Sequence, residues 1–282
     1  MIQGPELPAP TWFVGCGNMG SAILDGWRAA GMSLANVIAV DPAIPALQGV
    51  RTVGTFAEAG PPPKLIILGF KPQKLDEVSA QLRTWLTSKT IVVSLLVGVE
   101  VATLRERLPK AGAIVRALPN LPVAVRRGVI GLYSPDGDDA VRQQVANFFA
   151  PLGFAPWMTD EAKLAAVGSV AGAGPAYVAR FIAALTKAGE QRGLSKEIAS
   201  TIALETVLGT SWMAAANGET MDAIARRVAS PKGTTEAGLA VIDKEQVLDQ
   251  LVALTIEAAA RRGAELAEET KTAPLAEPAR LS

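Results

Sequence analysis

The stretch TWFVGCGNMG, residues 11–20, gives the strongest structural signal in the sequence. Its first four residues are β-branched or aromatic and predict a buried strand, and the next six form the pattern G-x-G-x-x-G. In this pattern the first glycine permits a tight turn, the second lets a pyrophosphate approach the backbone, and the third lets the following helix pack on the sheet. We therefore predict a Rossmann dinucleotide site whose phosphates bind at Gly15, Gly17, Asn18, Met19 and Gly20.

Asp41 bears on which form of the cofactor is used. It ends a second strand-like run, VIAVD, 21 residues after Gly20. An acidic side chain at this place hydrogen-bonds the adenosine ribose hydroxyls and repels a 2′-phosphate. No arginine follows before Arg51, so this interpretation favours NADH over NADPH. The alternative is that Asp41 is only a turn residue before Pro42.

The order of the segments predicts two domains. Strand-like and helix-like segments alternate at first, which is typical of parallel strands joined by crossover helices, whereas only helical spacing remains from residue 159. The predicted fold is α/β, with a Rossmann NAD(P)-binding domain over 11–158, an all-α substrate-binding and dimerisation domain over 159–270, and disordered segments at 1–10 and 271–282. The expected strands are 11–15, 37–41, 65–70, 90–96, 113–118, 128–134 and 154–159, and the expected helices include 18–31, 72–86, 100–108, 138–149, 174–193 and 196–218.

Composition excludes several classes of function. The 282 residues contain 27 Lys+Arg and 27 Asp+Glu, so no charge excess favours nucleic acid or an anionic membrane surface. No apolar stretch approaches the roughly 20 residues of a membrane helix, and the N-terminal segment lacks the features of a signal peptide. The sequence has no histidine, which excludes imidazole bases and histidine metal sites. Cys16, the single cysteine, fits a reducing cytoplasm and is expected to be a packed small residue rather than a nucleophile.

Two further strand ends carry candidate cofactor contacts. Phe70 ends the expected strand 65–70 and is followed by Lys71 and Pro72, and Asn120 lies in a stiff Pro-rich loop after the strand 113–118. Ligands of such sheets bind at the carboxyl ends of the strands, so we expect these residues to contact the cofactor. Lys71 has the alternative interpretation of a solvated residue at a helix start.

With these residues noted, the chain resembles the pyrroline-5-carboxylate reductase family over about residues 11–268. The resemblance is carried by FVGCGNMGSAIL (13–24), FKPQ (70–73), RALPNLP (116–122), GAGPAYVARFI (172–182), SPKGTTEAGL (230–239) and AAARRGAEL (258–266). It implies reduction of the cyclic imine of 1-pyrroline-5-carboxylate to L-proline by NAD(P)H. It also implies a homodimer, or a higher oligomer, whose active sites combine the cofactor domain of one subunit with the substrate loop of another.

Residues 230–235 are the expected substrate site. A helix that starts after Gly233 presents free backbone N–H groups to a carboxylate, and the hydroxyls of Ser230, Thr234 and Thr235 add donors. The resemblance implies that the Thr235 hydroxyl lies near the ring nitrogen of the imine and acts in catalysis. From the residues alone, the alternative is that Thr234 is an ordinary N-cap with Glu236 in the first turn.

The sequence departs from the family pattern in ways that leave other functions open. Ala171 and Ala173 stand where the family usually has hydroxyls, Leu121 stands where Thr is usual, and Lys232 replaces a common Gly. A less polar pocket fits a reductase of a different cyclic imine. A non-catalytic NAD(P)-binding regulatory protein is a second alternative. A 3-hydroxyacid dehydrogenase is a third, and it would need a catalytic lysine, for which Lys163 and Lys187 are the candidates.

Overall fold

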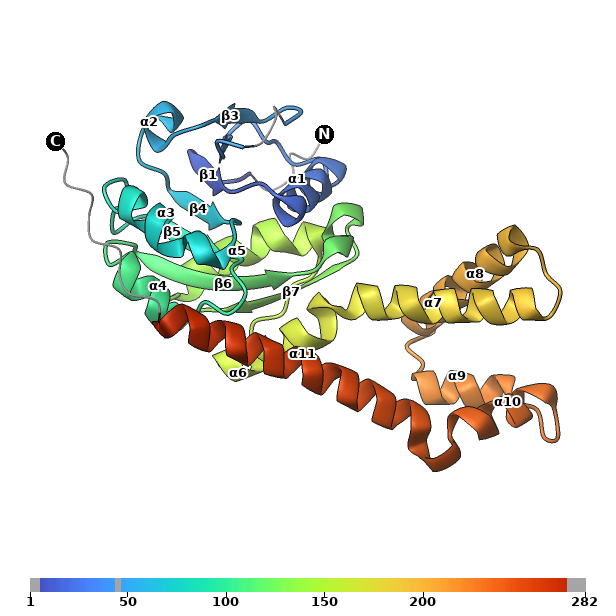
Figure 1. The fold of residues 1–282 in the computed structure, drawn as a ribbon. Coiled ribbons are helices and arrows are strands. Elements are labelled where there is room, and N and C mark those ends of the chain that lie inside the picture. The colour runs from blue at the N-terminus through green and yellow to red at the C-terminus, as the bar shows by residue number, and fades with distance from the viewer. Residues whose placement is uncertain (1–5, 44–46, 273–282) are drawn as a thin grey trace. The chain divides into compact units, whose positions relative to one another are not determined.

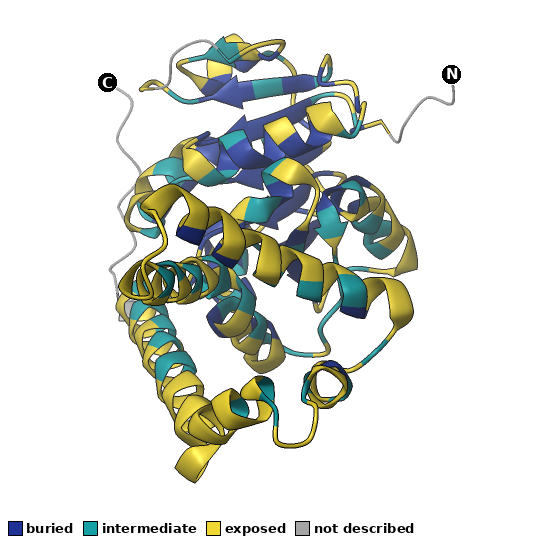
Figure 2. Ribbon diagram, turned by 90° about the vertical axis from the view of Figure 1, so that its right-hand side faces the viewer, coloured by how far each residue is buried: buried dark blue, intermediate teal, exposed yellow. Residues whose placement is uncertain are grey.

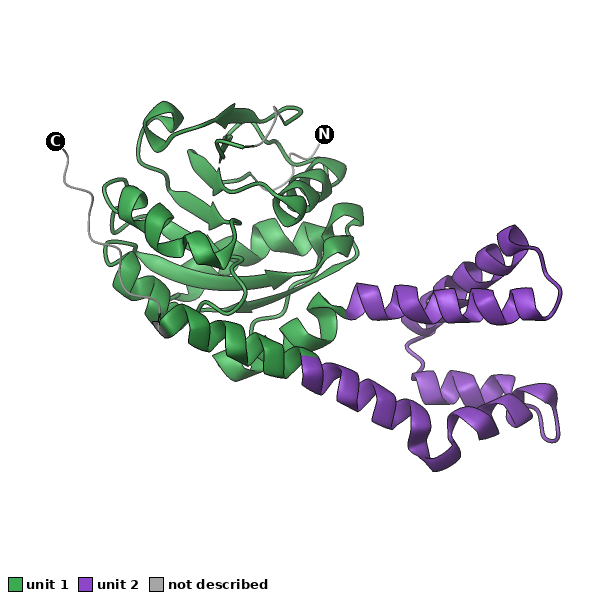
Figure 3. Ribbon diagram, viewed as in Figure 1, with its two compact units in different colours: residues 1–173, 259–282 green, residues 174–258 purple. Residues whose placement is uncertain are grey.

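The computed structural model describes residues 6–43 and 47–272, and the expectations for residues 1–5 and 273–282 fall outside this part. The chain forms two compact units (Figure 3). The first comprises the residues up to 173 together with those from 259 onward, and the second comprises residues 174–258. Helix α11, Val247–Thr272, contributes residues to both units.

The first unit is built on one sheet with the strand order β3-β2-β1-β4-β5-β6-β7-β8 (Figure 1). Strands β1 to β6 are parallel, as the motif order predicts, which confirms the Rossmann architecture. The strands are β1 Thr11–Val14, β2 Val37–Val40, β3 Arg51–Val53, β4 Leu65–Leu68, β5 Ile91–Ser94, β6 Ala113–Pro119, β7 Gly128–Tyr133 and β8 Gly153–Phe154.

The expectation of a wholly parallel sheet is wrong at β7, which pairs with β6 in the antiparallel direction. The connection between them is the short 3-10 segment Leu121–Val125 with its flanking residues. A parallel return needs a crossover of about a dozen residues or more, so this connection allows only an antiparallel neighbour. The expected strand 154–159 is also reduced to β8 and a single bridge between Leu132 and Trp157.

The helices of the first unit agree with the sequence except at their ends. The segment expected at 72–86 begins with a 3-10 turn, Pro72–Lys74, and continues as a shorter α-helix. The short helix α2 was not foreseen, although the capping box formed by Thr55 and Glu58 is visible in the sequence. The helices are α1 Asn18–Ala29, α2 Phe56–Ala59, α3 Leu75–Leu82, α4 Val101–Arg107, α5 Asp139–Phe149 and α6 Glu161–Val167.

Two apolar clusters cover the two faces of the sheet, because successive strand residues point to opposite sides. Phe13 packs with Trp27 of α1 on one face, and its neighbour Trp12 packs with Phe56 and Trp85 on the other. The strands are accordingly the most buried part of the chain (Figure 2). This core fixes the carboxyl ends of the strands, where the glycine-rich loop begins.

The expected disordered arm at residues 1–10 is wrong for the part that is described. Leu7 is buried in the core, and its carbonyl oxygen accepts a hydrogen bond from Asn36 Nδ2 at 3.3 Å. The Thr11 hydroxyl donates to the carbonyl of Pro8. An apolar residue among prolines in this segment therefore packs on the sheet instead of remaining in solvent.

The second unit is helical and carries many exposed apolar side chains. Phe181, Trp212 and Leu251 are each more than half exposed. Polar N-caps start two of the helices, Ser195 for α8 and Thr220 for α9. In the part of the chain that is described, no helix has the length and apolar character needed to cross a membrane. The helices are α7 Gly174–Gln191, α8 Lys196–Asn217, α9 Met221–Val228 and α10 Thr234–Ile242, followed by the first part of α11.

In the structure the boundary between the two compact units falls after Ala173, whereas the change from alternating strands and helices to helices alone predicts a boundary near residue 158. Helix α6 accounts for the difference, because Leu164 and Val167 pack over Gly131 of β7. Helix α6 therefore belongs to the first unit despite its helical sequence. Residues 271 and 272, assigned to the disordered tail, are the last residues of α11, where Lys271 pairs with Glu100 at 3.0 Å.

Candidate functional site

The glycine-rich loop has the geometry that its sequence predicts. Gly15 has φ of +81°, and a Cβ there would lie 2.7 Å from the Cβ and backbone N of Phe70, so glycine is required twice over. A Cβ on Gly20 would lie 3.1 Å from the ring of Phe13, which explains the third glycine by packing. A Cβ on Gly17 would meet no atom within 4 Å. The open space at Gly17 is where a ligand can approach the backbone.

Helix α1 begins at this loop without a side-chain cap. Gly17 is the N-cap residue, and its carbonyl already accepts the backbone N–H of Ser21 at 2.9 Å. The backbone N–H groups of Asn18, Met19 and Gly20 belong to the first turn, which has no intrahelical acceptor to offer them. The positive end of the helix dipole lies at the same place, so the loop fits the phosphates of a dinucleotide.

Asp41 lies beside this loop, as expected. Its Oδ2 accepts a hydrogen bond from the backbone N–H of Cys16 at 3.1 Å, and its Oδ1 accepts one from Ala43 at 2.9 Å. Both oxygens thereby fix the carboxylate at the carboxyl end of β2. Burial, with a smaller contribution from the Asp41 charge, raises the pKa of the Cys16 thiol to about 12. Cys16 is therefore a packed thiol, as the sequence indicates.

A pocket of about 160 Å³ opens next to Asp41. Gly15 and Phe70 line it, which brings together three of the residues predicted from separate motifs. Thr55 and Lys74 also line it, and the sequence reasoning missed both. The capping box at Thr55 could have been recognised, but nothing in the local sequence indicates that Lys74 lines this pocket.

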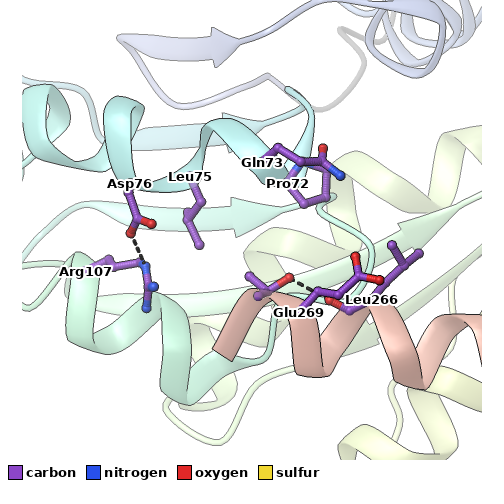
Figure 4. Close-up of a pocket in the computed structure, with 8 residues that line it drawn as sticks. Pro72, Gln73, Leu75, Asp76, Arg107, Leu266 and Glu269 are labelled. Carbon is purple, nitrogen blue, oxygen red and sulfur yellow. Dashed lines mark hydrogen bonds and ion pairs between the residues drawn. The ribbon is translucent and has the colours of Figure 1, made fainter. Parts of the chain in front are cut away.

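A second pocket of about 220 Å³ is lined by the 3-10 turn Pro72–Lys74, by α3 and by α11 (Figure 4). Pro72 lines this pocket instead of the one beside Gly15, and Lys71 is exposed. The buried Arg107 guanidinium donates from Nε to Asp76 Oδ1 at 2.7 Å, and the carboxylate of Glu269 accepts from Arg262. Arg107 and Asp76 therefore pair within the lining, whereas Glu269 pairs with Arg262, which is not one of the lining residues.

Asn120 is buried at the end of β6, and its side chain contacts the protein on both sides. Its Oδ1 accepts the backbone N–H of Val129 at 2.8 Å, and its Nδ2 donates to the carbonyl oxygen of Ala171 at 2.9 Å. Both polar atoms of the amide are thus bonded to the backbone, and the contact with the cofactor stays a prediction. Lys163 and Lys187 are exposed, and Lys163 Nζ donates to the Thr159 hydroxyl at 2.7 Å.

In the second unit, residues 230–235 form a turn that leads into α10. The N-cap is Gly233, so the alternative in which Thr234 caps the helix is wrong. The backbone N–H of Gly233 donates to the Ser230 carbonyl at 2.9 Å, and the Ser230 hydroxyl lies against the place where a Gly233 side chain would be. Within the described residues, no hydrogen bond to the hydroxyl of Thr234 or Thr235 is found. Both hydroxyls are therefore available to a ligand.

The same turn explains the residue at position 232. Lys232 has φ of +59°, a conformation that glycine adopts most easily and that costs other residues roughly 1 kcal/mol. The Glu236 carboxylate accepts the backbone N–H of Lys232 at 2.7 Å, which helps to hold this conformation. The Glu236 side chain thus bonds to the loop that precedes its own helix. Among the described residues, no group of three or more Cys, Asp or Glu side chains is placed to hold a metal ion.

Two family models match the chain. The model for pyrroline-5-carboxylate reductase dimerisation matches residues 161–266, and the model for coenzyme F420-dependent NADP oxidoreductase matches residues 12–98. The pyrroline-5-carboxylate reductase of Pseudomonas aeruginosa is 36% identical over 266 residues, which cover 91% of this chain and 96% of that protein. Relatives with this name therefore match almost the whole chain.

Solved structures give the same result. The pyrroline-5-carboxylate reductase of Coxiella burnetii is 30% identical with a TM-score of 0.83, covering 92% of this chain and 99% of that one. The Plasmodium falciparum pyrroline carboxylate reductase, solved with NADP bound, is 25% identical with a TM-score of 0.84, covering 94% and 100%. The similarity extends over both the sheet and the helical part.

Proposed function

Since the chain belongs to the pyrroline-5-carboxylate reductase family, we propose that it reduces the cyclic imine of 1-pyrroline-5-carboxylate to L-proline with NAD(P)H. The observation that carries the proposal is the start of α10, where Gly233 is the N-cap and the hydroxyls of Thr234 and Thr235 are available. These residues lie within the range matched by the reductase dimerisation model.

Each part of the substrate has a complementary group in this loop. The backbone N–H groups of the first turn of α10, with the Ser230 hydroxyl, would bind the substrate carboxylate. The Thr235 hydroxyl would donate to, or orient, the ring nitrogen. The cofactor supplies the hydride, and an iminium carbon is already electrophilic, so a reductase of this kind needs no histidine.

We propose that NADH is used in preference to NADPH. Asp41 is fixed by two backbone hydrogen bonds at the carboxyl end of β2, where its charge would repel a 2′-phosphate. Gly15, Gly17, Asn18, Met19 and Gly20 would hold the phosphates, and Phe70 and Lys71 would border the cofactor further along, whereas Pro72 lines the neighbouring pocket.

We propose a homodimer, or a higher oligomer, in which each active site is shared between subunits. The exposed apolar side chains of the second unit, Phe181 and Leu251 among them, are a reason for this assembly. The division into a cofactor domain up to about residue 158 and an all-α domain after it belongs to the same proposal. The single cysteine fits a reducing cytoplasm.

A reductase of a different cyclic imine is the second candidate. It is favoured by Ala171, Ala173 and Leu121, which lack the hydroxyls usual for the family at these positions, and Leu121 is 54% exposed. A pocket with fewer hydroxyls accepts a less polar ring more readily.

The test is a steady-state assay of NADH oxidation with 1-pyrroline-5-carboxylate, using wild type, Thr235→Ala, Thr235→Ser and Thr234→Ala. The Thr235→Ala change should lower kcat and kcat/KM together by roughly 10- to 100-fold, the effect of one hydrogen bond made in the transition state. Thr235→Ser should retain most activity, and Thr234→Ala measures separately what the neighbouring hydroxyl contributes to substrate binding.

The outcomes separate the candidates. Turnover of a larger or less polar cyclic imine, without turnover of 1-pyrroline-5-carboxylate, would favour the second candidate. Binding of NADH without turnover of any cyclic imine would point to a regulatory protein. Wild-type rates in Thr235→Ala would remove the catalytic role assigned to this hydroxyl.

A further inference from the structure

The side chain of Asn120 joins two segments that are far apart in the sequence. It is 6% exposed, and its two hydrogen bonds reach Val129 at the start of β7 and Ala171 in the π-helix Gly168–Gly172. One partner is a backbone donor and the other a backbone acceptor, so the orientation of the amide is fixed. Asn120 and Ala171 are 51 residues apart, and the bond between them ties the end of β6 to the π-helix.

The sequence removes one of the donors that a helix could offer to Ala171. Ala171 lies in the π-helix, whose carbonyls pair with residue i+5, and where the chain continues as an α-helix the donor is residue i+4. For Ala171 the residue at i+4 is Pro175, which has no N–H. A half-buried carbonyl without a donor destabilises the fold. The Asn120 amide supplies the donor that the proline lacks.

The π-helix is also packed closely on β6, the strand that ends just before Asn120. A Cβ on Gly168 would lie 3.2 Å from Leu118 Cδ1 of β6, a tight contact that shows how closely the two segments approach. The Ser169 hydroxyl turns inward and donates to the Ala166 carbonyl at 3.0 Å. The π-helix is thus held against β6 both by this packing and by the hydrogen bond from Asn120 to Ala171.

We propose that Asn120 is a positioning residue for the reductase and not a ligand of the cofactor. It holds residues 168–173, and with them Ala171 and Ala173, in one position relative to the carboxyl end of β6. Single turns of π-helix are frequent at functional sites, and this one is held by a side chain from the sheet. The inference rests on the proposed function for its effect on turnover, and on the structure alone for its effect on stability and cofactor binding.

The first test compares Asn120→Asp with Asn147→Asp. The aspartate keeps an acceptor for Val129 but places a second oxygen against the Ala171 carbonyl. Asn147 is an exposed residue of α5 that accepts from Gln143 at 2.8 Å, and it serves as the matched control. We expect Asn120→Asp to lower kcat by roughly 10-fold or more, because a small misplacement at a reacting site has effects of this size. We expect the Kd for NADH, measured by fluorescence titration, to change by less than about 2-fold, the range of indirect effects.

The second test restores a donor to Ala171. Pro175→Ala introduces an N–H four residues after Ala171, so it should recover at least half of the kcat and Tm lost in Asn120→Asp. The Tm loss itself should be roughly 3–8 °C, as for one buried hydrogen bond in a chain of this size. The double-mutant cycle measures the coupling directly.

Three results would overturn the proposal. A Kd for NADH that rises 10-fold or more in Asn120→Asp, with unchanged Tm, would make Asn120 a cofactor ligand. A Tm and kcat that Pro175→Ala does not restore would refute the role of the missing N–H. A kcat equal to wild type in Asn120→Asp would refute positioning. If wild type fails to turn over 1-pyrroline-5-carboxylate, the proposed function fails. The Tm values of the double-mutant cycle and the NADH titration still decide the role of Asn120.

Discussion

Replacing Asp41 by serine should change the choice of cofactor. The carboxylate is held by the backbone N–H groups of Cys16 and Ala43, so it cannot easily turn away from a 2′-phosphate on the adenosine ribose. A phosphate dianion about 5 Å from a carboxylate is disfavoured by roughly 2–3 kcal/mol at an effective dielectric constant of about 40–80. Removing the charge should therefore raise kcat/KM for NADPH relative to NADH by roughly 30- to 150-fold.

The assay is a side-by-side measurement of kcat/KM with NADH and NADPH for wild type, Asp41→Ser and Asp139→Ser. Asp139 is exposed on α5, so its substitution removes the same charge at a distance from the loop and should leave the ratio unchanged. Higher ionic strength should narrow the difference between cofactors in wild type, because salt screens the repulsion.

Lys74 provides the competing explanation. It lines the same pocket as Asp41, and a cation there can pair with a 2′-phosphate. Lys74→Met should therefore lower activity with NADPH more than activity with NADH. A wild type that prefers NADPH, with a ratio that Asp41→Ser does not alter, would refute the reasoning from Asp41 and make Lys74 the specificity residue.

Three further predictions follow from the same geometry. Gly15→Ala should raise the Kd for NADH at least 10-fold, because it combines strain at positive φ with a contact of 2.7 Å to Phe70. The control is Gly31→Ala, where φ is +74° but no atom lies within 4 Å of the new Cβ, and it should leave NADH binding unchanged. The Cys16 thiol, with a pKa of about 12, should have roughly one thiolate in 10,000 molecules at pH 8 and react with a disulfide reagent only after unfolding. The unfolded thiol ionises near pH 8.5–9 and the folded one does not, so this group should lower the free energy of unfolding as the pH rises from about 9 to 12. A free energy of unfolding that rises over this range in wild type but not in Cys16→Ala would contradict the assignment. In light scattering the wild-type protein should have at least twice the mass of one chain. The Leu251 side chain is 62% exposed, so Leu251→Glu should reduce this mass. An active monomer would be evidence against a shared site.

The sequence alone was sufficient where the signal is local. The strand 11–14, the three glycines and helix α1 follow one another along the chain, so their steric requirements could be predicted from neighbours. Asp41 was predicted correctly beside the loop because parallel strands end at the same edge. The loop before α10 was recognised from the run of Pro, Gly and Thr, although its N-cap is Gly233 and not Thr234.

The tertiary structure was needed where a contact joins distant segments. The direction of β7, the packing of Leu7 and the place of α6 in the first unit depend on pairing and burial across the chain. Asn120 was assigned to the cofactor from its place in a loop, yet its partner is Ala171, 51 residues away. Local patterns constrain backbone conformation over a few residues, but the partner of a buried polar group is set by which segments the whole fold brings together.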